Sequence, residues 1–196
     1  MRSGVPTASR KASPRGSRHL ALAALDATLG RSQPLDQALE HDPDFHRLPD
    51  RDRGFVQTLL LTTLRRLGQI DDVLARFIQR PMPQKRRAVQ MLLRLGACQL
   101  LFLRTPPHAA VSTAVALADR IRQRAHKGLI NAVLRRVASE GPAMVATQDA
   151  PRLNAPDWLW QSWSRAYGAF VAREIAEVHL AEAPLDLSVK IGRAHV

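Results

Sequence analysis

The residue types that most often carry out chemistry are present in this sequence, but they are not grouped into a catalytic motif. Cys98 stands within an apolar run, where a thiol is more often a small buried side chain than a nucleophile. Paired acids at Asp50/Asp52 and Asp71/Asp72 are better explained as helix caps or salt-bridge partners. The sequence contains no glycine-rich phosphate loop and no nucleophile elbow. We therefore predict that no residue of this chain is catalytic.

Metal-ligating residues are also scattered. The seven histidines show no ligand spacing: His19, His41, His46, His108, His126, His179 and His195. A single cysteine excludes an internal disulfide and a cysteine-rich zinc site. We therefore predict no metal site. One cysteine fits a reducing compartment, and we expect a cytoplasmic, bacterial protein.

Positive charge is the strongest chemical signal in the sequence. The chain has 29 Lys and Arg against 17 Asp and Glu, which gives a net charge of +12 and a pI near 11.4. Such a chain is attracted to polyanions, and we expect RNA, not DNA, as its partner. A GC-rich genome that encodes Arg in place of Lys is an alternative source of the arginines.

The basic residues form local groups. Lys85, Arg86 and Arg87 are equally well explained as a solvated helix face. One Tyr and five Phe argue against a base-stacking platform, so phosphate contacts are favoured. The residues expected to contact RNA are Arg10, Lys11, Arg15, Arg18, Arg124, Lys127, Arg135 and Arg136.

Residues 1–17 are expected to be a disordered basic arm, because this segment has no apolar face to bury and no acid. A mitochondrial transit peptide is the alternative, since the segment is rich in Arg and Ser. Pro6 and Pro14 would break the amphipathic helix that such a peptide needs.

Beyond the arm, apolar residues recur at a spacing of three to four from Leu20 to Val137. This periodicity predicts an all-α bundle of about seven helices over residues 18–140. Gly30 and Gly68 are placed to end helices, and Gly96 predicts a close helix crossing. The expected helices are 18–29, 34–40, 50–67, 70–78, 84–102, 106–121 and 124–139.

The C-terminal third differs in composition. Residues 141–156 are expected to be a linker, and residues 157–168 and 169–182 two amphipathic helices that carry Trp158, Trp160 and Trp163. Residues 185–190 alternate with period two, as in a strand. No run of 18 apolar residues occurs, so no membrane span is expected.

Several segments together resemble the NusB family: Asp52-Arg53 opening an apolar helix, LRLGACQLLFL (93–103), TPPHAAVSTAVALADR (105–120) and KGLINAVLRRV (127–137). Their order and spacing match over about 120 residues. The resemblance implies an all-α bundle that binds RNA through a basic N-terminal segment, which corresponds here to Arg15 and Arg18.

The family has two branches, which imply different functions. One is a free-standing transcription antitermination factor that binds RNA with a ribosomal protein. The other is the N-terminal module of the RsmB family of small-subunit rRNA cytosine-C5 methyltransferases, which use S-adenosylmethionine and two catalytic cysteines. Residues 155–168 and 181–190 resemble the second branch. The resemblance therefore implies an RNA-binding, non-catalytic fragment of an enzyme of ribosome biogenesis, with the cofactor belonging to the full-length parent and neither catalytic role falling to Cys98.

The last six residues, IGRAHV (191–196), depart from that family and match the translation of a common sequencing adapter. We therefore expect residues 157–190 to be the start of a truncated methyltransferase region and residues 191–196 to be non-native. The alternative is a chance coincidence of six ordinary residues.

Overall fold

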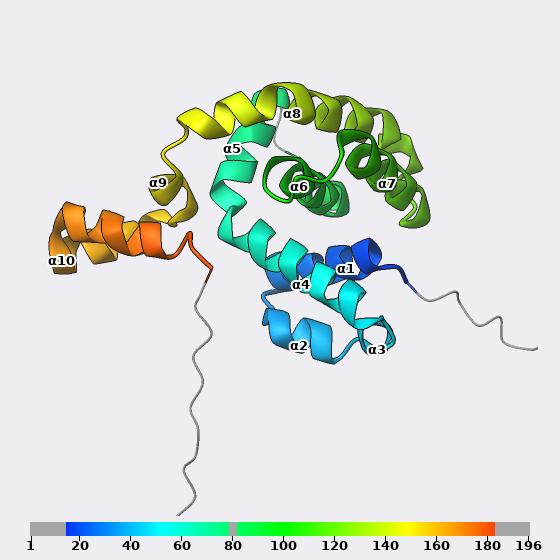
Figure 1. Cartoon of the computed structure of the whole chain (residues 1–196), viewed down its shortest axis with the longest axis horizontal. Coiled ribbons are helices and arrows are strands. Elements are labelled where there is room, and N and C mark those ends of the chain that lie inside the picture. Colours follow the sequence, from blue (N-terminus) through cyan, green and yellow to red (C-terminus); the bar gives the residue numbers. More distant parts are fainter. Residues whose placement is uncertain (1–14, 79–81, 183–196) are drawn as a thin grey trace, which may run out of the picture. The chain divides into compact units, whose positions relative to one another are not determined.

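The computed structural model describes residues 15–78 and 82–182 (Figure 1). The expected basic arm up to Pro14, the strand-like segment 185–190 and the six-residue tail lie outside these residues. Every regular element in the described part is a helix, so the all-α prediction is confirmed. The chain divides into two compact units, which separate between Gln148 and Asp149.

The first unit contains all the helices that the periodicity predicted, together with two short 3-10 turns. Its elements are α1 (Ser17–Arg31), α2 (Leu35–Glu40), α3 (Pro43–His46), α4 (Asp50–Arg65), α5 (Leu67–Phe77), η1 (Gln84–Arg86), α6 (Arg87–Leu101), α7 (Pro107–Arg120), η2 (Arg124–His126) and α8 (Lys127–Thr147).

Helix α6 lies at the centre of this unit and packs against α1, α4, α5, α7 and α8 (Figure 1). Its sequence is apolar nearly all round, as expected for a helix with neighbours on every side. Val89, Leu93, Ala97 and Cys98 are fully buried. Burial of each large apolar side chain stabilises the fold by roughly 1.5–3 kcal/mol.

Gly96 marks a close crossing of α6 and α8, as predicted. A Cβ atom at this position would lie 2.7 Å from Cδ1 of Leu134, which is fully buried. The two helices therefore approach each other at a point where only a hydrogen fits.

The predicted helix ends at Gly30 and Gly68 are wrong. Helix α1 continues to Arg31 and ends at Ser32, which itself adopts the left-handed conformation with φ 55°. Gly30 instead provides space, because its Cβ would lie 2.6 Å from Nε of Arg87. Gly68 lies inside α5, and the chain turns before it, at Arg66.

The helix expected to end at Ser139 continues to Thr147, through Pro142. Met144 and Val145 pack against the core, and this burial favours the extra turns although proline removes one backbone donor. The expected linker is therefore helical over residues 141–147 and again in α9 (Ala150–Asn154).

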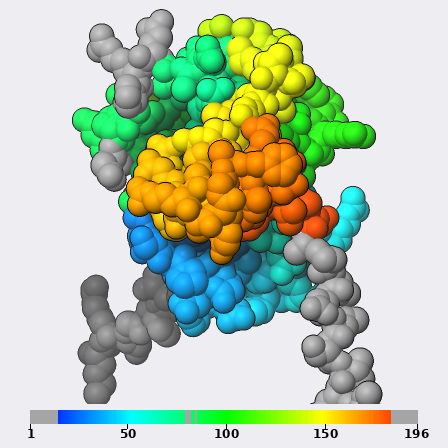
Figure 2. All heavy atoms as spheres, turned by 90° about the vertical axis from the view of Figure 1, so that its left-hand side faces the viewer, coloured from blue at the N-terminus to red at the C-terminus, as the bar shows by residue number. Residues whose placement is uncertain are grey.

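The second unit consists of α9 and α10 (Asp157–Val178), and Figure 2 shows their side chains gathered into one body. The expected boundary between helices 157–168 and 169–182 falls at Gly168, whose φ of 82° and ψ of 160° interrupt α10. The ring of Trp163, in the first half of α10, meets edge to face the ring of His179, which directly follows the second half, at 5.3 Å. Trp158 is 71% exposed and Phe170 76% exposed, so this unit presents aromatic side chains to solvent. None of the described helices combines the length and apolarity needed to cross a bilayer.

Candidate nucleic-acid interface

The N-terminus of α1 combines an acid-free first turn with cationic side chains. The helix begins at Ser17 with no acidic residue in its first turn, and Gly16 at the N-cap position offers no capping side chain. The N–H groups of His19 and Leu20 donate to the carbonyl of Gly16, and the positive end of the helix dipole has no acidic side chain from α1 itself. Arg18 and His19 add side chains to the same turn.

Arg18 is held in place from two directions. Its Nε donates a hydrogen bond of 2.7 Å to Oε1 of Gln99, and its guanidinium lies 4.9 Å from the ring centroid of Phe55. Gln99 is only 3% exposed, and its Nε2 donates to the carbonyl of Leu95. Burial lowers the pKa of Arg18, and among the described residues no carboxylate pairs with it. Arg18 is thus an oriented, half-buried cation that lacks a counterion within the described part of the chain.

Two hollows flank Arg18. The first has a volume of about 420 Å³ and is lined by Ser17, Arg18, Pro49, Arg51, Asp52 and Phe55. The second has a volume of about 340 Å³, and His19, Thr113 and Arg120 are among its lining residues. Burial, and then the charges of Arg15 and Arg120, lower the pKa of His19. At neutral pH the positive charge of this second hollow therefore comes from the arginines.

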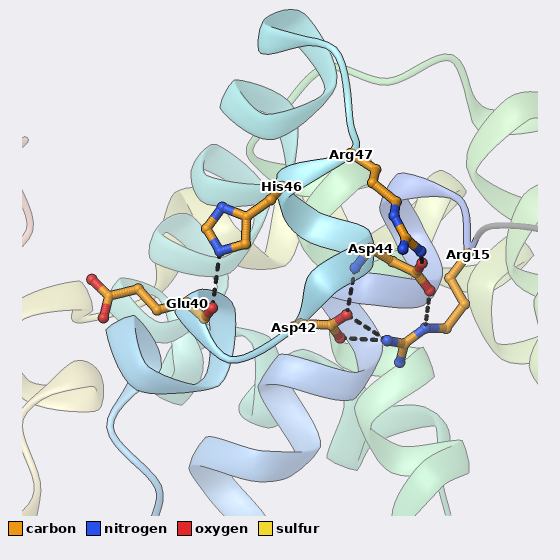
Figure 3. A network of polar contacts seen from close by, with 6 residues as sticks. All are labelled: Arg15, Glu40, Asp42, Asp44, His46 and Arg47. Carbon is orange, nitrogen blue, oxygen red and sulfur yellow. Dashed lines mark hydrogen bonds and ion pairs between the residues drawn. The ribbon is translucent and has the colours of Figure 1, made fainter.

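Arg15, unlike Arg18, is paired with carboxylates, and Figure 3 shows it beside Asp42 and Asp44. Its Nη2 lies 2.6 Å from Oδ2 of Asp42, and its Nε lies 3.0 Å from Oδ2 of Asp44. Arg47 also donates to Asp44, at 3.2 Å. The two carboxylates neutralise Arg15 and tie the start of α1 to α3, although its expected contact with RNA stays a prediction.

The other predicted contacts lie along the last helices of the first unit. Arg124 and Lys127 both pair with Asp119, at 2.7 and 3.6 Å. Arg136 pairs with Glu140 at 3.0 Å, and its guanidinium lies 4.4 Å from the ring centroid of Phe77. Arg135 is exposed and lines a groove of about 760 Å³ between α7 and α8.

The predicted residues therefore do not form one cluster. Arg135 and Arg136 lie at least two helical turns from Lys127 along α8, a rise of roughly 12–14 Å. Arg10 and Lys11 lie outside the described residues.

Several residues of this surface were not predicted as site residues. Gln99 had a recognisable signal, because an amide at a core position of an apolar helix needs a buried partner. Arg51, Asp52 and Phe55 belong to a helix some thirty residues beyond Arg18, and no local pattern predicts that they line the same hollow.

Comparison with known proteins identifies a family model and several relatives that match this chain. The sequence model of the NusB family matches residues 15–139. A protein of Shigella flexneri named ribosomal RNA small subunit methyltransferase B is 34% identical over 184 residues, which cover 92% of this chain and 42% of that protein. The protein of the same name from Cronobacter sakazakii is 35% identical over 161 residues, covering 79% of this chain and 37% of the relative. The chain thus spans about two fifths of the length of these curated relatives.

Proposed function

The chain belongs to the NusB family, and on that premise we propose that it is an RNA-binding module whose contact surface is centred on the N-terminus of α1. Arg18 is the observation that carries the proposal. A half-buried guanidinium without a carboxylate partner among the described residues is unfavourable by itself, and a phosphate group supplies the missing charge. The net charge of +12 adds long-range attraction to the same polyanion.

We further propose that the RNA is ribosomal and that the module serves a longer, S-adenosylmethionine-dependent cytosine-C5 methyltransferase in ribosome biogenesis. The names of the curated relatives support this assignment. The alignment to the Shigella flexneri relative is longer than the family match, so it runs into the second unit. A free-standing antitermination factor needs no such second unit.

The chain by itself is proposed to be non-catalytic. Transfer of a methyl group to C5 of cytosine requires a thiolate that adds to C6. Cys98 is the single cysteine of the sequence, it is fully buried, and burial raises its pKa to about 11. This thiol does not fit the role of a nucleophile. Incubation of the chain with labelled S-adenosylmethionine and rRNA is expected to give no transfer above background, and transfer that disappears in Cys98→Ser would contradict the proposal.

The binding proposal is tested by comparing two neighbouring arginines. Arg18→Gln is expected to weaken RNA binding and to reduce the slope of log K against log salt by about one, because one phosphate contact is lost. Arg15→Gln is expected to leave that slope unchanged, because Asp42 and Asp44 already neutralise Arg15. Fluorescence anisotropy with a labelled rRNA fragment between about 50 and 200 mM salt measures both.

Circular dichroism and urea unfolding serve as controls, since both variants must remain folded for the comparison. If the Arg18→Gln variant binds with the affinity and the salt slope of the natural chain, the N-terminus of α1 is not the RNA contact surface. Equal slope changes in both variants would show that Arg15 leaves its carboxylates when RNA binds.

A further inference from the structure

The first hollow beside Arg18 has walls of two kinds. Pro49 and Phe55 contribute apolar surface, whereas Arg18, Arg51 and Asp52 contribute charge. A surface that binds only phosphate gains nothing from a carboxylate, since the two anions repel each other. Asp52 lies in the first turn of α4, where a negative charge is favourable, and its carboxylate in the hollow also suits a ligand that carries hydrogen-bond donors as well as negative charge.

Asp52 differs from the other aspartates of the described residues in having no partner. Every other aspartate there makes a hydrogen bond or an ion pair, including Asp50, which pairs with Arg53 in the same helical turn. Asp52 is half-buried and lines the same hollow as Arg18, yet these two side chains do not form an ion pair. The lining of the hollow thus includes an acceptor without a partner among the described residues and a donor fixed by Gln99.

An unpaired nucleobase presents the complementary groups. The Watson–Crick edge of guanine carries one acceptor, O6, beside two N–H donors, N1–H and N2–H₂. An Arg guanidinium matches O6, and a carboxylate accepts from both donors at once. Adenine presents its amino group where guanine has O6, and cytosine has only one amino donor for the carboxylate. In single-stranded RNA these edges are free to be contacted.

From this arrangement we infer that the hollow between Arg18 and Asp52 binds an unpaired guanine of the RNA. This inference rests on the proposed RNA-binding function and adds base selectivity to it. Gln99 fixes Nε of Arg18, so one terminal nitrogen of the guanidinium donates to O6 and the other keeps the phosphate contact proposed above, while Asp52 accepts from N1–H and N2–H₂. Arg51, exposed on the same wall, contacts the phosphate of the bound nucleotide.

The experiment uses the full chain and four labelled decamers, oligouridine and oligouridine with one central G, A or C. The natural chain is expected to bind the G decamer about tenfold more tightly than the other three decamers, in which a uridine or a base without the full set of guanine groups must occupy the hollow. Asp52→Asn keeps the size of the side chain but cannot accept both donors as a charged group, so the G preference is expected to fall to about twofold or less. Binding of oligouridine by this variant is expected to be unchanged or slightly tighter, because a negative charge is removed.

Arg51→Gln is the matched control on the same helical turn. It is expected to weaken binding of all four decamers by a similar factor and to keep the G preference. Equal affinity of the natural chain for the G and A decamers would overturn the guanine inference while leaving RNA binding intact. Failure to bind any decamer at low salt would overturn both. The comparison of decamers on the natural chain decides the matter even where a variant fails to fold.

Discussion

Arg18, at the surface, and Gln99, in the core, are joined by a hydrogen bond of 2.7 Å from Nε to Oε1. Gln99 lies on the central helix α6 and is almost entirely buried, so it has little freedom to move. Its hydrogen bond therefore fixes the guanidinium of Arg18 relative to the core. A long side chain that is fixed in this way loses less conformational entropy when it binds a ligand. The proposed binding surface is therefore organised by a residue that is itself buried in the core.

Gln99→Leu tests this relationship. The leucine fills a similar volume but cannot accept from Arg18, so we expect RNA affinity to fall about threefold to tenfold although residue 99 is buried. The free energy of unfolding is expected to fall by about 1–3 kcal/mol, because the Nε of Arg18 remains partly buried without an acceptor. Anisotropy titration and urea unfolding measure the two effects. Gln57→Leu, at an exposed position of α4, is the control and should change neither.

Gly96 and Gly54 both lie inside helices, α6 and α4, so alanine substitutions at the two positions can be compared directly. Gly96→Ala is expected to destabilise the fold by about 1–2 kcal/mol, because the new methyl group would lie 2.7 Å from the side chain of Leu134 in a packed core. Gly54→Ala is expected to stabilise it by about 0.5–1 kcal/mol, because nothing lies within 4 Å and alanine favours the helix. Urea unfolding of both variants measures the difference. A Gly96→Ala protein as stable as Gly54→Ala would show that α6 and α8 can separate at no cost.

The fold of the first unit was largely predictable, because buried positions of its long helices repeat every three or four residues. The errors lie where local geometry overrides that pattern. Helix α1 ends at Ser32, whose φ is 55°, and not at Gly30, which lies where the side chain of Arg87 passes. Helix α8 passes Pro142 because Met144 and Val145 gain burial. The periodicity of apolar residues describes one helix at a time, so it does not predict contacts between different helices.

The candidate site was only partly predictable, for the same reason. Arg15 and Arg18, before and at the start of α1, are visible in the sequence as basic residues with no acid near them. Their different partners cannot be predicted from the sequence: Asp42 and Asp44 neutralise Arg15, whereas Arg18 donates to Gln99. These partners lie 27, 29 and 81 residues away along the chain, and only the tertiary fold brings them together.

The Arg15 network predicts a dependence of stability on pH. A hydrogen bond from Arg15 holds the pKa of Asp44 below its usual value of 3.8. A carboxyl group whose pKa is lower in the folded state stabilises the fold at pH values above its unfolded pKa, and this contribution is lost as the pH falls through the folded pKa. The stability difference between the natural chain and Asp44→Asn is therefore expected to be constant above about pH 5 and to shrink below about pH 4.

Urea unfolding at a series of pH values measures this difference. In an Arg15→Gln background the same substitution is expected to show a much weaker pH dependence, because the main hydrogen-bond donor to Asp44 is gone. An unchanged pH profile in that background would assign the effect to Arg47, the other donor to this carboxylate.

Deletion of residues 1–14 separates the charge of the arm from the fold. This segment carries Arg2, Arg10 and Lys11 and no acid, and both the described structure and the family match begin at Arg15. We expect the thermal unfolding midpoint to stay unchanged while RNA affinity falls and the slope of log K against log salt decreases by about two, since about 0.7 counterions are released per phosphate contact with a single strand. A variant of full length with Arg2, Arg10 and Lys11 all changed to Gln should reproduce the deletion, because charge and not chain length is responsible. If the neutralised arm binds like the natural chain and only the deletion weakens binding, the arm acts through other contacts, and Arg10 and Lys11 are not phosphate ligands.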